Sequence, residues 1–147
     1  MKIEIWSDIA CQWCYVGKKR FESALAQFEQ HDEVEVRWRS FELDTFRAYF
    51  TDGARISDHE VLIRLAADVG LEGAEARAAL AEGRFASEVR ADESSAREVG
   101  INGVPYFVID RRYSVSGARP PEALLAAMRE GYAARSSIGA GEEEGAS

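Results

Sequence analysis

The chain has 147 residues, the length of a single domain that can also hold an inserted subdomain. Its hydrophobic fraction of 46% is enough for a packed core, and its net charge of −8, without a basic stripe, argues against nucleic-acid binding. No apolar run approaches the length of a membrane span and Met1 leads directly into a strand pattern without a signal peptide, so we expect a cytoplasmic protein with no membrane association.

The first elements in the chain are a strand, a helix and a second strand. Residues 2–7 alternate between isoleucine and charged side chains, which predicts a strand. Aromatic residues and leucine at helical spacing predict a helix within residues 15–30. Alternation resumes at residue 34 and predicts a second strand, with one solvent-exposed face, that continues to residue 43.

The middle of the chain is helical in pattern. An aromatic turn or short helix is expected at residues 46–50, and Ser57 with Glu60 forms a capping-box pattern before the next helix. Further helices are expected over residues 73–82 and 85–99.

The hydrophobic period changes again near the C-terminus. Residues 104–109 form a continuous apolar run, which is typical of a central strand buried on both faces. A turn and an alternating segment at residues 113–115 predict an antiparallel partner strand, and residues 120–132 predict a last helix. Residues 136–147 are rich in Gly, Ser, Ala and Glu, so we expect a disordered acidic tail.

The order of elements predicts an α/β fold. The first strand–helix–strand unit should be parallel and right-handed, and the later strand pair should be an antiparallel hairpin. This order is thioredoxin-like, with helices inserted in the middle. We therefore expect a thioredoxin-like domain formed by residues 1–44 and 100–135, and an inserted helical subdomain at residues 45–99.

The two cysteines are the strongest functional signal. Cys11 and Cys14 are the only cysteines, and they lie between the first predicted strand and the first predicted helix. A helix N-terminus favours the thiolate, which is the reactive form of cysteine. Cys11 can therefore act as the nucleophile, and Cys14, within the same turn, can attack the mixed disulfide that results.

Other interpretations of the cysteine pair are weaker. A structural disulfide would close a very short loop and remove little chain entropy. A zinc site would need two more ligands, and the only histidines, His31 and His59, are isolated in the sequence, so we expect no metal. Two unrelated buried cysteines remain the third alternative.

Two motifs in this order resemble the DsbA family of thioredoxin-fold oxidoreductases, and more narrowly its FrnE-like branch. The first is Ile5-Trp6-Ser7-Asp8 leading into Cys11-Gln12-Trp13-Cys14-Tyr15, and the second is Ile101-Asn102-Gly103-Val104-Pro105-Tyr106-Phe107. Residues 115–120 also match the C-terminal pattern of that branch. The resemblance covers nearly the whole chain up to about residue 132.

The resemblance implies a thiol–disulfide oxidoreductase. It implies a redox-active Cys11–Cys14 pair that faces a cis Val104–Pro105 peptide bond and exchanges disulfides with protein or small-molecule thiols. The Val104 backbone would bind an extended substrate by strand addition. Gln12 is expected to be exposed beside the thiols, and Trp13 either contacts substrate or packs at the helix start.

The chain departs from the family pattern in two ways. Gln12 occupies a position between the cysteines that is usually proline. Only Thr45 separates two segments between which relatives carry several more helices, so half of the helical insert is expected to be missing. Apolar surface near Trp38, Phe41 and Phe46 should then be exposed, and we expect a homodimer, with or without exchange of helices between chains.

Two other functions stay open at this point. Kappa-class glutathione transferases and 2-hydroxychromene-2-carboxylate isomerases belong to the same family neighbourhood, and for that class glutathione would be a co-substrate. Their motif usually begins with serine, so Cys11 favours the dithiol mechanism, which needs no cofactor. The third function is that of a non-catalytic thioredoxin-like scaffold that only self-associates.

Overall fold

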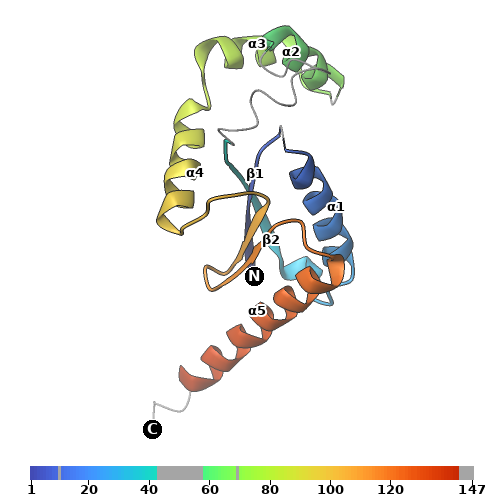
Figure 1. Ribbon diagram of the computed structural model, residues 1–147, viewed down its shortest axis with the longest axis vertical. Coiled ribbons are helices and arrows are strands. Elements are labelled where there is room, and N and C mark those ends of the chain that lie inside the picture. Colours follow the sequence, from blue (N-terminus) through green and yellow to red (C-terminus); the bar gives the residue numbers. More distant parts are fainter. Residues whose placement is uncertain (10, 43–57, 69, 143–147) are drawn as a thin grey trace.

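The computed structural model of the protein describes residues 1–9, 11–42, 58–68 and 70–142. Its elements begin with a βαβ unit, continue through three helices and end with a hairpin and a long helix (Figure 1). Their bounds are β1 Lys2–Ser7, α1 Gln12–Ala26, the short 3₁₀ helix η1 His31–Glu33, β2 Glu35–Ser40, α2 His59–Asp68, α3 Gly73–Glu82, α4 Ala86–Glu98, β3 Tyr106–Ile109, β4 Tyr113–Ser116 and α5 Pro121–Glu142.

The four strands form one mixed sheet in the order β2-β1-β3-β4. β1 pairs in parallel with β2 and antiparallel with β3, and β3 pairs antiparallel with β4. The α/β class, the parallel first unit and the later hairpin are therefore confirmed.

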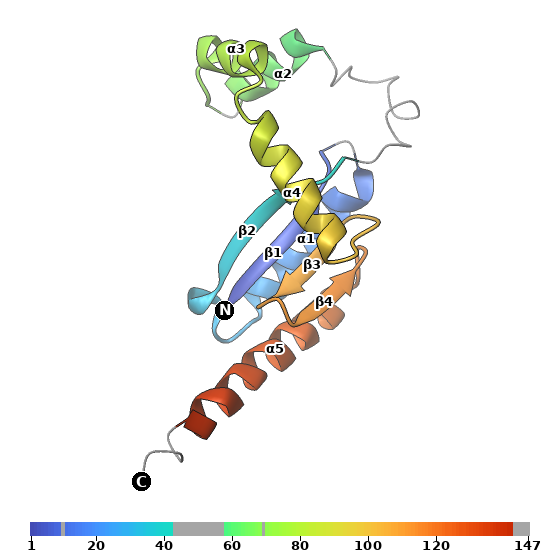
Figure 2. The same ribbon diagram turned by 90° about the vertical axis from the view of Figure 1, so that its left-hand side faces the viewer.

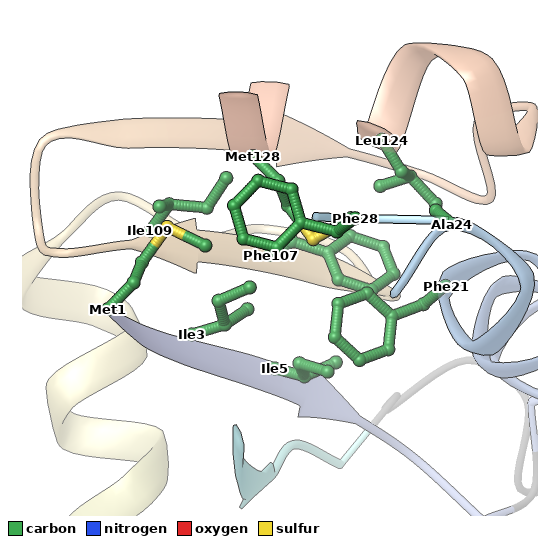
Figure 3. Packing of buried hydrophobic residues seen from close by; sticks show 10 residues of the cluster. All are labelled: Met1, Ile3, Ile5, Phe21, Ala24, Phe28, Phe107, Ile109, Leu124 and Met128. Carbon is green, nitrogen blue, oxygen red and sulfur yellow. The ribbon is translucent and has the colours of Figure 1, made fainter. Parts of the chain in front are cut away.

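One face of the sheet packs against α1 and α5. Ile3 and Ile5 of β1 point into this core and are no more than 1% exposed. Figure 3 shows them beneath Phe21 and Phe28 of the α1 region. Phe21 also stacks on Phe107 of β3 with ring centroids 5.7 Å apart. This packing fixes the position of α1, and with it the position of the cysteines, against β1 and β3.

α4 covers part of the opposite face, as the turned view in Figure 2 shows. Ala96 packs with Trp6, and the Trp6 indole donates a hydrogen bond to the Asp92 carbonyl oxygen at 3.1 Å. Arg39 of β2 bridges the layers, because its Nη1 donates to Asp92 Oδ1 at 2.7 Å and its Nε donates to Glu4 Oε1 at 3.0 Å.

Glu4 is a buried carboxylate on this face, at 2% exposed. Burial by itself would raise its pKa, but the hydrogen bond and the charge of Arg39 hold the pKa of the Glu4 carboxyl below its usual range. The ion pair thus lets a charged side chain lie between the sheet and α4.

α2 and α3 pack on each other and stand beyond the end of the sheet in both views (Figures 1 and 2). α4, which the sequence assigned to the same inserted subdomain, packs instead on the sheet. The expected aromatic segment at residues 46–50 and the Ser57 cap lie outside the described residues. Asp58 provides a capping contact at this helix start, because its Oδ1 accepts from the Glu60 amide at 2.9 Å.

The structure differs from the sequence prediction at the ends of three elements. α1 begins at Gln12 and ends at Ala26, earlier than expected at both ends, and η1 follows before β2. β2 ends at Ser40, where the Asp92 carboxylate accepts from the Ser40 amide at 2.9 Å. α5 continues to Glu142, so residues 136–142 are helical where we expected a disordered tail. None of the helices within the described residues is long and apolar enough to cross a membrane.

Candidate active site at the start of helix α1

The two cysteines lie between the end of β1 and the first turn of α1. A tight turn links the elements, with the Cys11 amide donating to the Asp8 carbonyl oxygen at 3.2 Å. Cys11 is the N-cap residue, with extended φ and ψ of −91° and 111°, and the Cys14 amide donates back to the Cys11 carbonyl at 3.0 Å. Cys11 is therefore at the positive end of the helix dipole.

The two thiols differ in their exposure to solvent. Cys11 is partly exposed, whereas Cys14 is 3% exposed, and both are free thiols. Burial raises the pKa of the Cys14 thiol to about 11, against the hydrogen bonds that the Asp8 amide and the Ser7 hydroxyl donate to it. The Asp8 nitrogen lies 3.5 Å from Cys14 Sγ. Cys14 is therefore a protonated thiol at neutral pH, while Cys11 is the accessible sulfur.

The Val104–Pro105 loop faces the dithiol. Its peptide bond is cis, and the Val104 carbonyl oxygen lies 4.0 Å from Cys11 Sγ. Pro105 is fully buried against α1 at Gly17, where a Cβ atom would lie only 2.6 Å from Pro105 Cγ. The bare Gly17 backbone is thus what allows the loop to approach the helix that carries both cysteines.

A cleft of about 570 Å³ opens beside the two thiols, between α1 and the end of β2. Its apolar walls include Ile9, Tyr15 and Trp38, which are 86%, 65% and 45% exposed, and Lys18 also lines it. Ligand clefts usually combine apolar walls with a few polar groups, and this volume lies in their usual range.

The structure brings together most of the residues that the sequence singled out. Cys11, Cys14, Val104 and Pro105 meet at one end of the sheet, and Gln12 and Trp13 are exposed on the first turn of α1. Trp38, expected only as exposed apolar surface, borders the dithiol cleft. Phe41 is half-buried, and Phe46 lies outside the described residues.

Three further residues at the site were not expected there from the sequence. Tyr15 and Lys18 belong to the amphipathic pattern of α1, and their place in the cleft depends on how α1 packs beside β2. Gly17 is a glycine within a helical pattern, which is the one signal that could have indicated a close approach of another segment.

The fold and this arrangement define a thioredoxin-fold protein with two free thiols at the start of α1 and a cis-proline loop opposite them. The model of the DSBA-like thioredoxin domain family matches residues 2–46 and 44–129. The chain belongs to this family. The two matched stretches meet at residues 44–46, the place where the sequence indicated that helices are missing.

Individual relatives agree with this assignment. The crystal structure of the probable DsbA oxidoreductase SCO1869 from Streptomyces coelicolor superposes with a TM-score of 0.80 at 34% identity, covering 90% of each chain. The uncharacterized protein YwbO of Bacillus subtilis (strain 168) is 24% identical, with 73% of this chain and 86% of that protein covered. That alignment runs over 176 positions, more than the 147 residues of this chain, so YwbO carries residues without a counterpart here.

Proposed function

We propose that the protein is a thiol–disulfide oxidoreductase in which Cys11 is the attacking thiolate and Cys14 the resolving thiol. The observation that carries the proposal is the asymmetry of the pair. Cys11 is accessible at the helix N-terminus, 4.0 Å from the Val104 carbonyl oxygen, whereas Cys14 is buried one turn further along.

The reaction then has two exchange steps. The Cys11 thiolate attacks one sulfur of a substrate disulfide, the substrate S–S bond breaks, and the first substrate thiolate leaves and takes up a proton. Cys14 loses its proton and attacks Cys11 Sγ, which releases the second substrate thiol. The Cys11–Cys14 pair is oxidised to a disulfide and the substrate is reduced; the reverse sequence oxidises a substrate dithiol.

The surroundings of Cys11 favour a substrate that binds alongside the Val104–Pro105 loop. An extended substrate segment can pair with the Val104 backbone by strand addition, with its sulfur directed at Cys11. Trp13, which is 56% exposed, and Gln12 lie beside this approach and supply contact surface. Protein disulfides and small-molecule disulfides both fit this arrangement.

Single-cysteine variants test the assignment. Cys11→Ser should abolish the formation of a mixed disulfide with a disulfide-containing peptide, whereas Cys14→Ser should trap that adduct, which mass spectrometry detects. A dithiothreitol-dependent insulin reduction assay should lose activity with the first substitution. Full activity of Cys11→Ser in this assay would show that the roles are assigned wrongly.

The cleft beside Cys11 supports one alternative, a glutathione-dependent transferase or isomerase. Its volume of about 570 Å³ suits a small molecule next to the thiols. In that mechanism glutathione supplies the thiol, so Cys14→Ser should leave a glutathione-dependent conjugation or isomerisation rate intact. A rate that needs both cysteines and no glutathione excludes this alternative.

A further inference from the structure

β2 is an open edge of the sheet. In the order β2-β1-β3-β4 the two border strands are β2, with six residues, and β4, with four. β2 forms the outer border of the sheet in Figure 2, and no strand within the described residues pairs with its outer side. Unprotected edges of this kind are templates for pairing with another chain.

The hydrogen bonds to β1 determine which backbone groups of β2 face outward. The Glu35 amide donates to the Met1 carbonyl at 2.8 Å and the Phe41 amide to the Ser7 carbonyl at 3.1 Å, so the odd-numbered residues of β2 face β1. The N–H and C=O groups of Val36 and Trp38 therefore point to the open side.

The two ends of β2 are already occupied. The Ser40 amide donates to Asp92, and the Val34 amide donates to the His31 carbonyl at 3.1 Å. The open stretch is therefore short. Its donors are the amides of Val36 and Trp38, and its acceptors are the outward-facing carbonyls of Val34, Val36 and Trp38.

A second copy of the strand fits this stretch in antiparallel orientation about a two-fold axis. Three registers let both outward-facing amides donate, centred on Val36, on Arg37 or on Trp38. The last of these is unfavourable because it places Arg37 opposite Arg39 of the second copy. In the first register, Glu35 lies opposite Arg37 of the second copy, so each dimer gains two pairs of opposite charge. The second register places Arg37 opposite its own copy, which is unfavourable, and pairs Glu35 with Arg39, which Glu4 and Asp92 already hold.

We propose that two copies of this chain associate through β2, with Val36 on the two-fold axis, to form a continuous eight-stranded sheet. Val36 donates to and accepts from Val36 of the second copy, and Trp38 donates to the Val34 carbonyl. Trp38 shares a face with Val36, because the two are in register with Ile5 and Ile3 on the core side of β1, and Val34 packs against the same core. The exposed Trp38 ring is therefore covered by apolar side chains of the second copy.

α4 leaves room for this pairing. α4 meets β2 at its Ser40 end, so the α4 helices of the two copies lie at opposite ends of the paired strands. The antiparallel register also brings the start of one β2, preceded by the acidic His31–Glu33 turn, next to the end of the other, where Trp38 and Lys18 border the cleft. The second copy would thereby complete one rim of each dithiol cleft.

Charge-swap variants test the register directly by sedimentation over a concentration series from about 1 to about 100 μM. The wild type should shift from a species of 16.3 kDa to one of twice that mass. Glu35→Arg and Arg37→Glu should each weaken association by about tenfold or more, because each places two like-charge pairs in the dimer. The double variant and an equimolar mixture of the two single variants should both restore it. Arg112→Glu, in the β3–β4 turn, is the matched charge control and should leave association unchanged.

The outcomes separate this interface from other assemblies. A wild type that stays at 16.3 kDa throughout the series would overturn the proposal. A dimer that both single variants leave intact would place the contact elsewhere, as in an exchange of helices, and would overturn it too. Restoration in the mixture supports the Val36-centred register, because the two variant strands then regain both opposite-charge pairs. None of these readouts depends on redox activity.

Discussion

Gly17→Ala is the substitution that most directly tests the contact between α1 and the Val104–Pro105 loop. Gly17 lies within α1, where alanine is ordinarily favoured over glycine by about 1 kcal/mol. The added Cβ, however, would lie 2.6 Å from Pro105 Cγ and 3.2 Å from Pro105 Cβ. Carbon atoms in contact prefer about 3.5–4.0 Å, so the helix and the loop would have to move apart by about 1 Å.

The magnitude follows from these opposing effects. Overpacking of this kind costs about 1–3 kcal/mol, which outweighs the gain in helix propensity. We expect Gly17→Ala to lower the free energy of unfolding by up to about 2 kcal/mol in urea denaturation. Because α1 carries both cysteines, a displacement of about 1 Å from Val104 should also slow disulfide exchange, by up to about 100-fold.

The same substitution at Gly103 is the control. Gly103 lies in the loop next to Val104, and its added Cβ would meet no atom within 4 Å. Gly103→Ala should therefore stay within about 0.5 kcal/mol of the wild type and keep its exchange rate. If Gly17→Ala were instead stabilised by about 1 kcal/mol with unchanged exchange kinetics, the close helix–loop contact would be refuted.

Two further predictions concern buried ionisable groups. Because burial raises the pKa of Cys14 to about 11, its protonated form stabilises the fold fully below the unfolded pKa of about 8.5, and this contribution is lost as the pH rises through 11. Over this range the free energy of unfolding of the reduced protein should fall by up to about 3 kcal/mol relative to that of Cys14→Ala. Parallel pH profiles of the two proteins in urea unfolding would contradict this. Arg39→Met should lower the free energy of unfolding by about 3–5 kcal/mol, because it leaves the Glu4 carboxylate buried without its main partner. Adding Glu4→Gln should recover part of that loss, and an undiminished denaturation midpoint in Arg39→Met would contradict the prediction.

The strand pattern of the sequence was sufficient for the fold because alternating residues and a continuous apolar run both differ from the helical period. The continuous apolar run before Asp110 reflects burial on both faces, whereas β1 alternates in sequence although its residues 3–6 are all buried. The ends of elements were less predictable, because they depend on distant side chains. β2 ends at Ser40, where the carboxylate of Asp92, more than fifty residues away, binds the Ser40 amide.

The candidate site, too, was predictable from the sequence only where the signal is local. The cysteine spacing and the loop before Tyr106 are local signals, and the structure places them face to face. The cleft walls come from separate elements, so the sequence predicts Trp38 only as exposed apolar surface and not as part of the cleft. Buried Glu4 is the clearest difference, since the alternation in β1 does not indicate that α4 covers the face on which Glu4 lies.

The separation of α2 and α3 from the sheet has a consequence for how this protein can vary. These helices pack on each other beyond the end of the sheet, and the core beneath the dithiol draws none of its buried side chains from them. Helices can therefore be gained or lost at this position without repacking the residues that hold α1. The length of the insert is thus decoupled from the geometry of the thiols.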